Sequence, residues 1–143
     1  MSKQWNHLFE KTVQGITREQ IWQTWSDVNN WTAWDKELEE TKLSGPFQNG
    51  SHFTLKPKGG PVVKITITEC EPLKSFTDVT HFPLAKMIDR HELIETPEGL
   101  KIRNELTVTG PLAWLWRKIV AENVANGMPQ QIDSMIEYIH TKK

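Results

Sequence analysis

Residues 110–140 read GPLAWLWRKIVAENVANGMPQQIDSMIEYIH, and this stretch decides how the rest of the chain can fold. Its apolar residues recur at intervals of three and four: Leu112, Leu115, Trp116, Ile119, Val120, Val124, Met128, Ile132, Met135, Ile136 and Ile139. Such spacing places them on one face of an α-helix. Gly110-Pro111 marks the start, because a first helical turn leaves the N–H that proline lacks unpaired anyway. The stretch therefore predicts a long amphipathic C-terminal helix.

The length of this predicted helix and the residues inside it lead to two further predictions, a packing partner along the helix and a kink. At roughly 1.5 Å per residue, a helix over 112–141 is about 45 Å long, so another part of the chain must lie along it. Gly127 and Pro129 stand inside the pattern, and Pro129 removes a donor and crowds the carbonyl of Ala125. We therefore expect a kink near 125–129.

The N-terminal residues predict a strand followed by two short helices. Residues 5–14 alternate loosely between apolar and polar side chains, which favours a strand. Thr17-Arg18-Glu19-Gln20 has the S/T-x-x-E/Q pattern of a capping box, which predicts a helix start. That helix carries Ile21, Trp22, Trp25 and Val28 on one face. A turn over 27–30 ends it, and a second short turn holds Trp31 and Trp34.

From residue 38 to residue 109 the pattern has the period of two that is typical of strands. We expect strands near 37–44, 51–57, 62–70, 74–82, 86–96 and 100–109, separated by glycine and proline. Short connections between them imply an antiparallel meander. Val63, Ile65 and Ile67 alternate with polar residues, which gives the sheet one apolar face. The C-terminal helix can cover that face, and the chain reads as one domain over 1–143.

Composition narrows the class of protein. The chain has 143 residues and a formal net charge of −1, without the basic stripe of a nucleic-acid binder. Its one cysteine, Cys70, excludes an intramolecular disulfide and a cysteine-cluster metal site. The sequence has no apolar run near 18 residues and no signal peptide at its start, so we expect a cytoplasmic protein without a transmembrane segment. The sequence leaves homodimer formation open.

Several local motifs resemble a known family: Ile21-Trp22, Asp27, Trp31-Thr32-Ala33-Trp34-Asp35, Gly45 and Gly50 before Ser51-His52-Phe53, and Thr109-Gly110-Pro111-Leu112. With the element order, they resemble the START-like helix-grip superfamily (SRPBCC), in its polyketide cyclase/dehydrase and lipid-transport branch. The resemblance implies an α+β fold, with a curved seven-stranded antiparallel sheet wrapped around the long helix and two short helices after the first strand. It also implies a cavity between sheet and helix for a hydrophobic or amphipathic small molecule.

His91 is the first candidate for chemistry in that cavity. It shares strand parity with Met87 and Leu93, so its ring is expected on the cavity side, where the resembling proteins often carry an apolar residue. Asp89 has the same parity and can orient the ring or hold a proton. The alternative is a partly buried histidine whose nitrogens are satisfied by Asp89 or by the backbone.

Other candidates line the same predicted space. Asn104 interrupts an apolar strand face, and its amide needs partners that a ligand or a water can supply. Trp31 and Trp34 flank the expected cavity mouth, although they can equally close the end of the sheet as core residues. The remaining predicted ligand contacts are Phe53, Ile65, Leu93, Val124 and Met128, for which core packing is the alternative.

The sequence therefore predicts a domain that binds a small hydrophobic molecule, either lipid-like or aromatic and polyketide-like. The first alternative is a cyclase or dehydratase with His91 and Asp89 as acid and base. The second is a protein-interaction module. The five histidines lack metal-ligand spacing, and Gly59-Gly60 is read as a hairpin tip rather than a phosphate loop, so no metal and no cofactor are expected.

Overall fold

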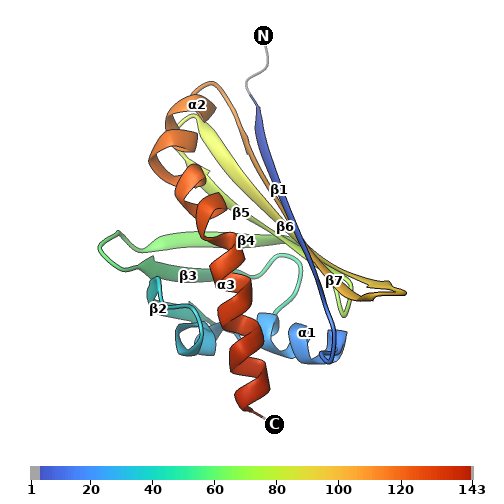
Figure 1. The fold of residues 1–143 in the computed structure, drawn as a ribbon. Helices are drawn as coiled ribbons and strands as arrows, with labels where there is room; N and C mark the ends of the chain where they lie inside the picture. The colour runs from blue at the N-terminus through green and yellow to red at the C-terminus, as the bar shows by residue number, and fades with distance from the viewer. Residues whose placement is uncertain (1–3, 143) are drawn as a thin grey trace.

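The computed structural model describes residues 4–142, in which seven strands form one antiparallel sheet in the order β1-β7-β6-β5-β4-β3-β2 (Figure 1). The strands are β1 (Trp5–Val13), β2 (Leu38–Leu43), β3 (His52–Pro57), β4 (Val63–Glu71), β5 (Ser75–Phe82), β6 (Ala85–Thr96) and β7 (Gly99–Thr109). From β2 to β7, each strand pairs with the next one in the sequence, and β1 pairs with β7 at one edge of the sheet. The predicted meander is confirmed.

Helices occupy the two places that the sequence predicts. Between β1 and β2 lie α1 (Arg18–Ser26) and the 3-10 helix η1 (Val28–Ala33). Thr17 caps α1: its hydroxyl accepts from the Gln20 amide at 3.1 Å, and the Gln20 side chain accepts from the Thr17 amide at 2.9 Å. The C-terminal helix runs across one face of the sheet, so the helix-grip fold is confirmed (Figure 1). In the described part of the chain, no helix is long and apolar enough to cross a membrane.

The C-terminal helix contains an irregular segment that the sequence did not predict. It comprises α2 (Ala113–Trp116), the π-helical segment η2 (Arg117–Ala121) and α3 (Glu122–Thr141). Pro129 lies inside α3 without ending it, because proline withholds only its own donor from the ladder. The expected kink near 125–129 stays a prediction, while the π-helical segment at Arg117–Ala121 is an irregularity that the sequence did not predict.

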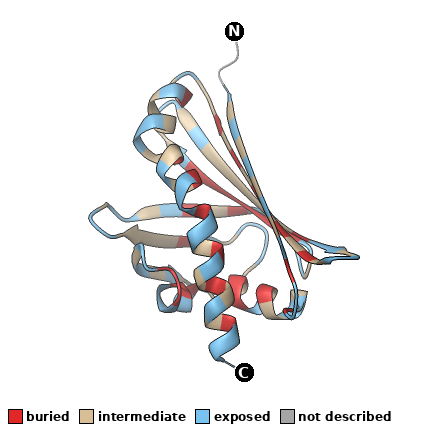
Figure 2. Cartoon of the chain, in the orientation of Figure 1, coloured by how far each residue is buried: buried red, intermediate tan, exposed pale blue. Residues whose placement is uncertain are grey.

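The apolar interior between sheet and helix divides into two clusters, and the buried residues of α3 face the sheet (Figure 2). The tryptophan cluster contains Trp25, Trp31, Trp34, Phe53, Phe76, Ile102 and Ile132 among others. The alanine cluster contains Leu106, Val108, Ala113, Ala121, Ala125 and Met128. Phe9 packs against both clusters, so the boundary between them passes beside this ring.

Gly110, at the turn into α2, has no room for a side chain. Its φ is +113°, and a Cβ there would lie 2.7 Å from the Leu84 carbonyl oxygen and 2.9 Å from the Ala85 Cα. Gly110→Ala is therefore expected to lower the free energy of unfolding by about 1–3 kcal/mol, measured by urea denaturation. Gly127→Ala is the matched control, because its Cβ would meet nothing within 4 Å. This helical substitution should stabilise by about 0.5–1 kcal/mol, and an equal loss in both variants would contradict the steric argument.

Candidate functional site

A break in the apolar face of two neighbouring strands positions the candidate site. On β7, Asn104 stands between Ile102 of the tryptophan cluster and Leu106 of the alanine cluster. Asn104 is opposite Phe9, the ring that packs against both clusters, in the pairing of β7 with β1. On its other side Asn104 is opposite His91 of β6. The polar residues therefore lie at the boundary between the two apolar clusters.

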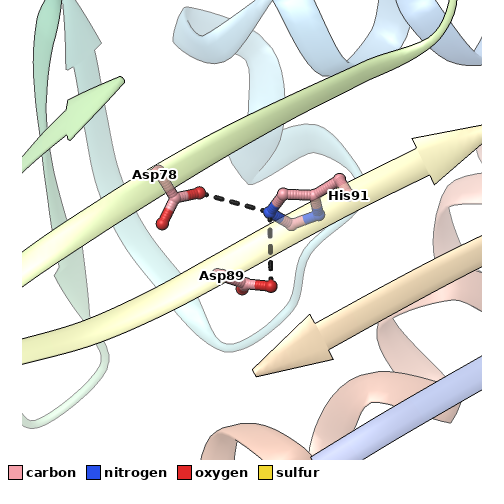
Figure 3. A group of neighbouring side chains, drawn as sticks. All are labelled: Asp78, Asp89 and His91. Atoms are coloured by element: carbon pink, nitrogen blue, oxygen red, sulfur yellow. Dashed lines mark hydrogen bonds and ion pairs between the residues drawn. The ribbon is translucent and has the colours of Figure 1, made fainter. Parts of the chain in front are cut away.

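Four side chains form this polar cluster: Asp78 of β5, Asp89 and His91 of β6, and Asn104 of β7. Strand register brings them together, because Asp78 pairs with Asp89 and His91 pairs with Asn104. His91 Nε2 lies 3.2 Å from Asp78 Oδ2 and 3.5 Å from Asp89 Oδ1, so both carboxylates converge on one ring nitrogen (Figure 3). The imidazole is thus placed to exchange a proton with either carboxylate.

Aromatic rings hold the His91 imidazole from the side of the tryptophan cluster. Phe76, opposite His91 on β5, stacks on the imidazole with ring centroids 4.1 Å apart and an interplanar angle of 10°. Trp25 of α1 contacts the same ring edge-on at 5.5 Å. Packing on two sides fixes the ring orientation, which positions Nε2 between the carboxylates.

The buried environment shifts the proton affinity of the cluster. Burial raises the pKa of Asp89 to about 7; the positive charge of His91 opposes this rise, and the negative charge of Asp78 adds to it. For His91, burial alone would lower the pKa. The charge of Asp89, together with the charge and hydrogen bond of Asp78 and the nearby Asn104 side chain, outweighs burial and raises it. The cluster therefore contains an acid and a base whose pKa values are both raised by their surroundings.

Two oxygens of the polar cluster are buried without a hydrogen-bond partner within the described residues: Asp89 Oδ1 and Asn104 Oδ1. Asn104 is only 3% exposed, and a buried amide oxygen without a donor is costly. The side chains of Asp78, Asp89 and His91 nevertheless keep 11%, 16% and 13% of their surface accessible. The cluster as a whole therefore keeps a small accessible surface, whereas its two unpartnered oxygens are fully buried.

The raised pKa values predict that the cluster stabilises the fold less as pH rises. Asp89 ionises near pH 3.8 in the unfolded chain but near 7 in the folded one, so its ionisation removes stability across that interval. His91 acts in the same direction, because its folded pKa is raised above 6.5 and its contribution is lost as pH passes through it. The charged groups that face Asp89 and His91 are Asp78 and the other member of the pair. Asn104 and the buried α3 residues that face the sheet are uncharged.

Urea denaturation of wild type and Asp89→Asn at roughly pH 5, 6.5 and 8 measures this dependence. Asparagine cannot ionise, so the unfolding free energy of the variant should fall less steeply over that range. Glu40→Gln, which removes an exposed carboxylate on β2, is the control and should keep the wild-type slope. Equal slopes in wild type and Asp89→Asn would show that Asp89 does not titrate in this interval.

The structure brings some predicted site residues together and separates others. His91, Asp89 and Asn104 meet in the polar cluster. Trp31, Trp34, Phe53, Ile65 and Leu93 belong to the tryptophan cluster, whereas Met128 belongs to the alanine cluster and Val124 packs against it. The Trp31 ring N–H donates to the carbonyls of Thr24 and Trp25 at 3.2 and 3.1 Å, so the fold itself uses the polar end of Trp31. Contact of these residues with a ligand stays a prediction.

Sequence reasoning missed Asp78, Phe76 and Trp25 as members of the site. The signal for Asp78 was its parity, which it shares with Phe76 and Thr80 on β5. Asp78, Asp89 and His91 each offer one possible metal-ligand atom, and these atoms all lie within 4.8 Å of one another. The three residues come from two strands, so the spacing of histidines along the sequence does not reveal that they converge. The expectation that the chain binds no metal stays a prediction.

A second concave region lies away from the polar cluster. It is an open hollow of about 480 Å³ between the β1–α1 turn, residues 13–19, and the β6–β7 hairpin, residues 95–100. None of the predicted site residues lines it. The cavity between sheet and helix stays a prediction.

Comparisons with known proteins agree with this fold. The family model described as polyketide cyclase / dehydrase and lipid transport matches residues 9–139. No curated protein matches the sequence significantly.

Similar solved structures share the fold at low sequence identity. The hypothetical protein jhp0584 of Helicobacter pylori has a TM-score of 0.75 at 16% identity, over 94% of this chain and 87% of that one. Ara h 8.0201 has a TM-score of 0.72 at 14% identity, over 96% and 99%. The di-domain ARO/CYC StfQ of the steffimycin biosynthetic pathway has a TM-score of 0.78 at 11% identity, over 97% of this chain and 51% of that one. At these identities the likeness establishes the fold alone.

Proposed function

Because this chain belongs to the polyketide cyclase/dehydrase and lipid-transport family, we propose that it binds a small hydrophobic molecule between the sheet and α3. One observation carries the proposal: two buried oxygens, Asp89 Oδ1 and Asn104 Oδ1, have no hydrogen-bond partner among the described residues. They lie where two apolar clusters meet, so a mainly apolar molecule with one polar group suits both surroundings.

The two clusters would supply most of the binding energy. Apolar surface removed from water contributes about 25 cal/mol per Å², so a ligand of modest size gains several kcal/mol from contact with these side chains. Met128 on α3 and Met135, about two turns further along the helix, are both 1% exposed. Their unbranched thioether side chains can change rotamer to fit an irregular guest. The polar cluster would then fix the orientation of the ligand.

A second function, acid–base catalysis on a polyketide-like substrate, is favoured by one specific observation. Asp89 and His91 lie 3.5 Å apart, and the pKa of Asp89 is raised to about 7, which suits a group that donates and accepts protons near neutral pH. The similar StfQ structure is described as a di-domain ARO/CYC of a biosynthetic pathway. Under this reading the bound molecule is a substrate, and His91 with Asp89 moves its proton.

Native mass spectrometry of gently purified protein, followed by solvent extraction, tests for a copurified molecule. Titration with a neutral solvatochromic dye then measures the affinity of the stripped protein. Asn104→Leu removes a polar contact and should weaken a ligand that hydrogen-bonds there about tenfold. Asn6→Leu makes the same substitution at an exposed position of β1 and should leave the affinity unchanged.

The outcomes separate the two functions from failure of both. A bound molecule with no turnover supports a carrier or receptor. Turnover that is lost in His91→Ala while affinity is retained supports the enzyme. If the protein carries no small molecule and no apolar dye saturates it, the proposed function is wrong.

A further inference from the structure

We infer that the polar group of the bound molecule is a protonated amine, so that the ligand class is an apolar amine rather than an alcohol or a carboxylic acid. The inference rests on the proposed function, since it names the headgroup that the polar cluster would bind. The observations behind it are the charge count of the cluster, the kind of atom left without a partner, and the way these atoms converge.

The charge count leaves the cluster one cation short when both carboxyls are ionised. Asp78 and Asp89 supply two acidic groups, and the one basic side chain that pairs with either in the described part of the chain is His91. The arginines of β6 and β7 pair with other carboxylates: Arg90 pairs with Glu69 and Glu92, and Arg103 pairs with Glu10 and Glu92. A buried excess negative charge is stabilised when a cation pairs with it.

The unpartnered atoms are acceptors, which selects a donor on the ligand. Asp89 Oδ1 and Asn104 Oδ1 are hydrogen-bond acceptors. Both lie beside the His91 imidazole, but neither has a hydrogen bond of normal geometry within the described residues. An ammonium group carries three N–H donors and a positive charge, so one group can serve several oxygens. A hydroxyl offers one donor and no charge. A carboxylate or phosphate would place a further negative charge beside two carboxylates.

The polar atoms of the cluster lie close enough together for one headgroup to contact several of them. One carboxylate oxygen each of Asp78 and Asp89 and a ring nitrogen of His91 lie within 4.8 Å of one another. Asn104 is directly opposite His91 in the pairing of β6 with β7. Apolar surface adjoins this polar point on both sides, from Ile102 in one cluster and Leu106 in the other. An alkyl or aryl amine matches this arrangement, because its carbon skeleton can lie in the apolar interior while its nitrogen contacts the oxygens.

A matched set of ten-carbon ligands isolates the headgroup: decylamine, 1-decanol and decanoate, each competing with a neutral solvatochromic dye. In wild type, decylamine should bind at least about tenfold more tightly than decanol, and decanoate most weakly. In Asp78→Asn and Asp89→Asn, the preference for the amine over the alcohol should fall to about threefold or less. Glu40→Gln removes an exposed carboxylate from β2 and should keep the wild-type preference.

Each result either supports or overturns the inference. Decanol or decanoate binding as tightly as decylamine overturns it and leaves the proposed function standing. A wild-type preference for the amine that survives both aspartate substitutions also overturns it, because the amine would then bind elsewhere. Stoichiometric Zn²⁺ binding that excludes decylamine would assign the cluster to a metal instead. If the dye itself fails to bind wild type, the proposed function fails first.

Discussion

Trp25→Ala is expected to lower the free energy of unfolding by about 3–5 kcal/mol, the largest loss that we expect from one side chain of the tryptophan cluster. Trp25 is 5% exposed and contacts Phe76 at 5.2 Å and His91 at 5.5 Å between ring centroids. Its removal leaves a cavity under α1 and frees one side of the imidazole. Urea denaturation followed by circular dichroism measures the loss without relying on tryptophan fluorescence.

The same substitution at Trp114 is the matched control. Trp114 is 58% exposed on α2, so Trp114→Ala should change the unfolding free energy by less than about 0.5 kcal/mol. A small loss for Trp25→Ala, comparable to that of Trp114→Ala, would mean that α1 does not pack on the sheet as described.

His91→Phe is the second large expected effect, with a loss of about 3–5 kcal/mol near pH 8. Phenylalanine can keep the stacking on Phe76 but removes the imidazole that lies between Asp78 and Asp89. Two carboxylates that face each other in register then remain buried without a cation. The loss should shrink near pH 5, because Asp89, whose pKa burial raises to about 7, can then hold a proton.

A triple variant separates charge from packing in this experiment. Asp78→Leu/Asp89→Leu/His91→Phe removes both carboxylates together with the imidazole, so it should recover most of the stability that His91→Phe loses. If the triple variant is as unstable as His91→Phe alone, the imidazole stabilises the fold by its shape rather than by its charge. A double-mutant cycle on Asp89 and His91 gives the pairwise coupling.

The fold was predictable because its signals are local. Alternation of side chains defines the six strands after residue 37, and the Thr17–Gln20 capping box sets the start of α1. The π-helical segment at 117–121 carried no comparable signal, since no glycine or proline marks it. Pro129 does not interrupt α3, because a helix supported on the sheet tolerates the loss of one hydrogen bond.

The site was predictable in part, for a reason that lies in strand geometry. Parity placed Asp89, His91 and Asn104 on the inner face correctly, because residues two apart in a strand share a face. Asp78 was missed because residues 75–80 of β5 are all buried, so the contrast between a wet and a dry face disappears there. The strand register decides which residues lie opposite one another on neighbouring strands. Register also depends on the geometry of the turns, which the alternation of side chains within one strand does not reveal.

A crystal structure of the protein with decylamine bound tests the central claim most directly. The account predicts the amine nitrogen within hydrogen-bonding distance, about 2.7–3.0 Å, of Asp89 Oδ1 and Asn104 Oδ1. The alkyl chain should lie between the sheet and α3, against the two apolar clusters. Decylamine found instead in the hollow between the β1–α1 turn and the β6–β7 hairpin, with the polar cluster unchanged, would contradict the account.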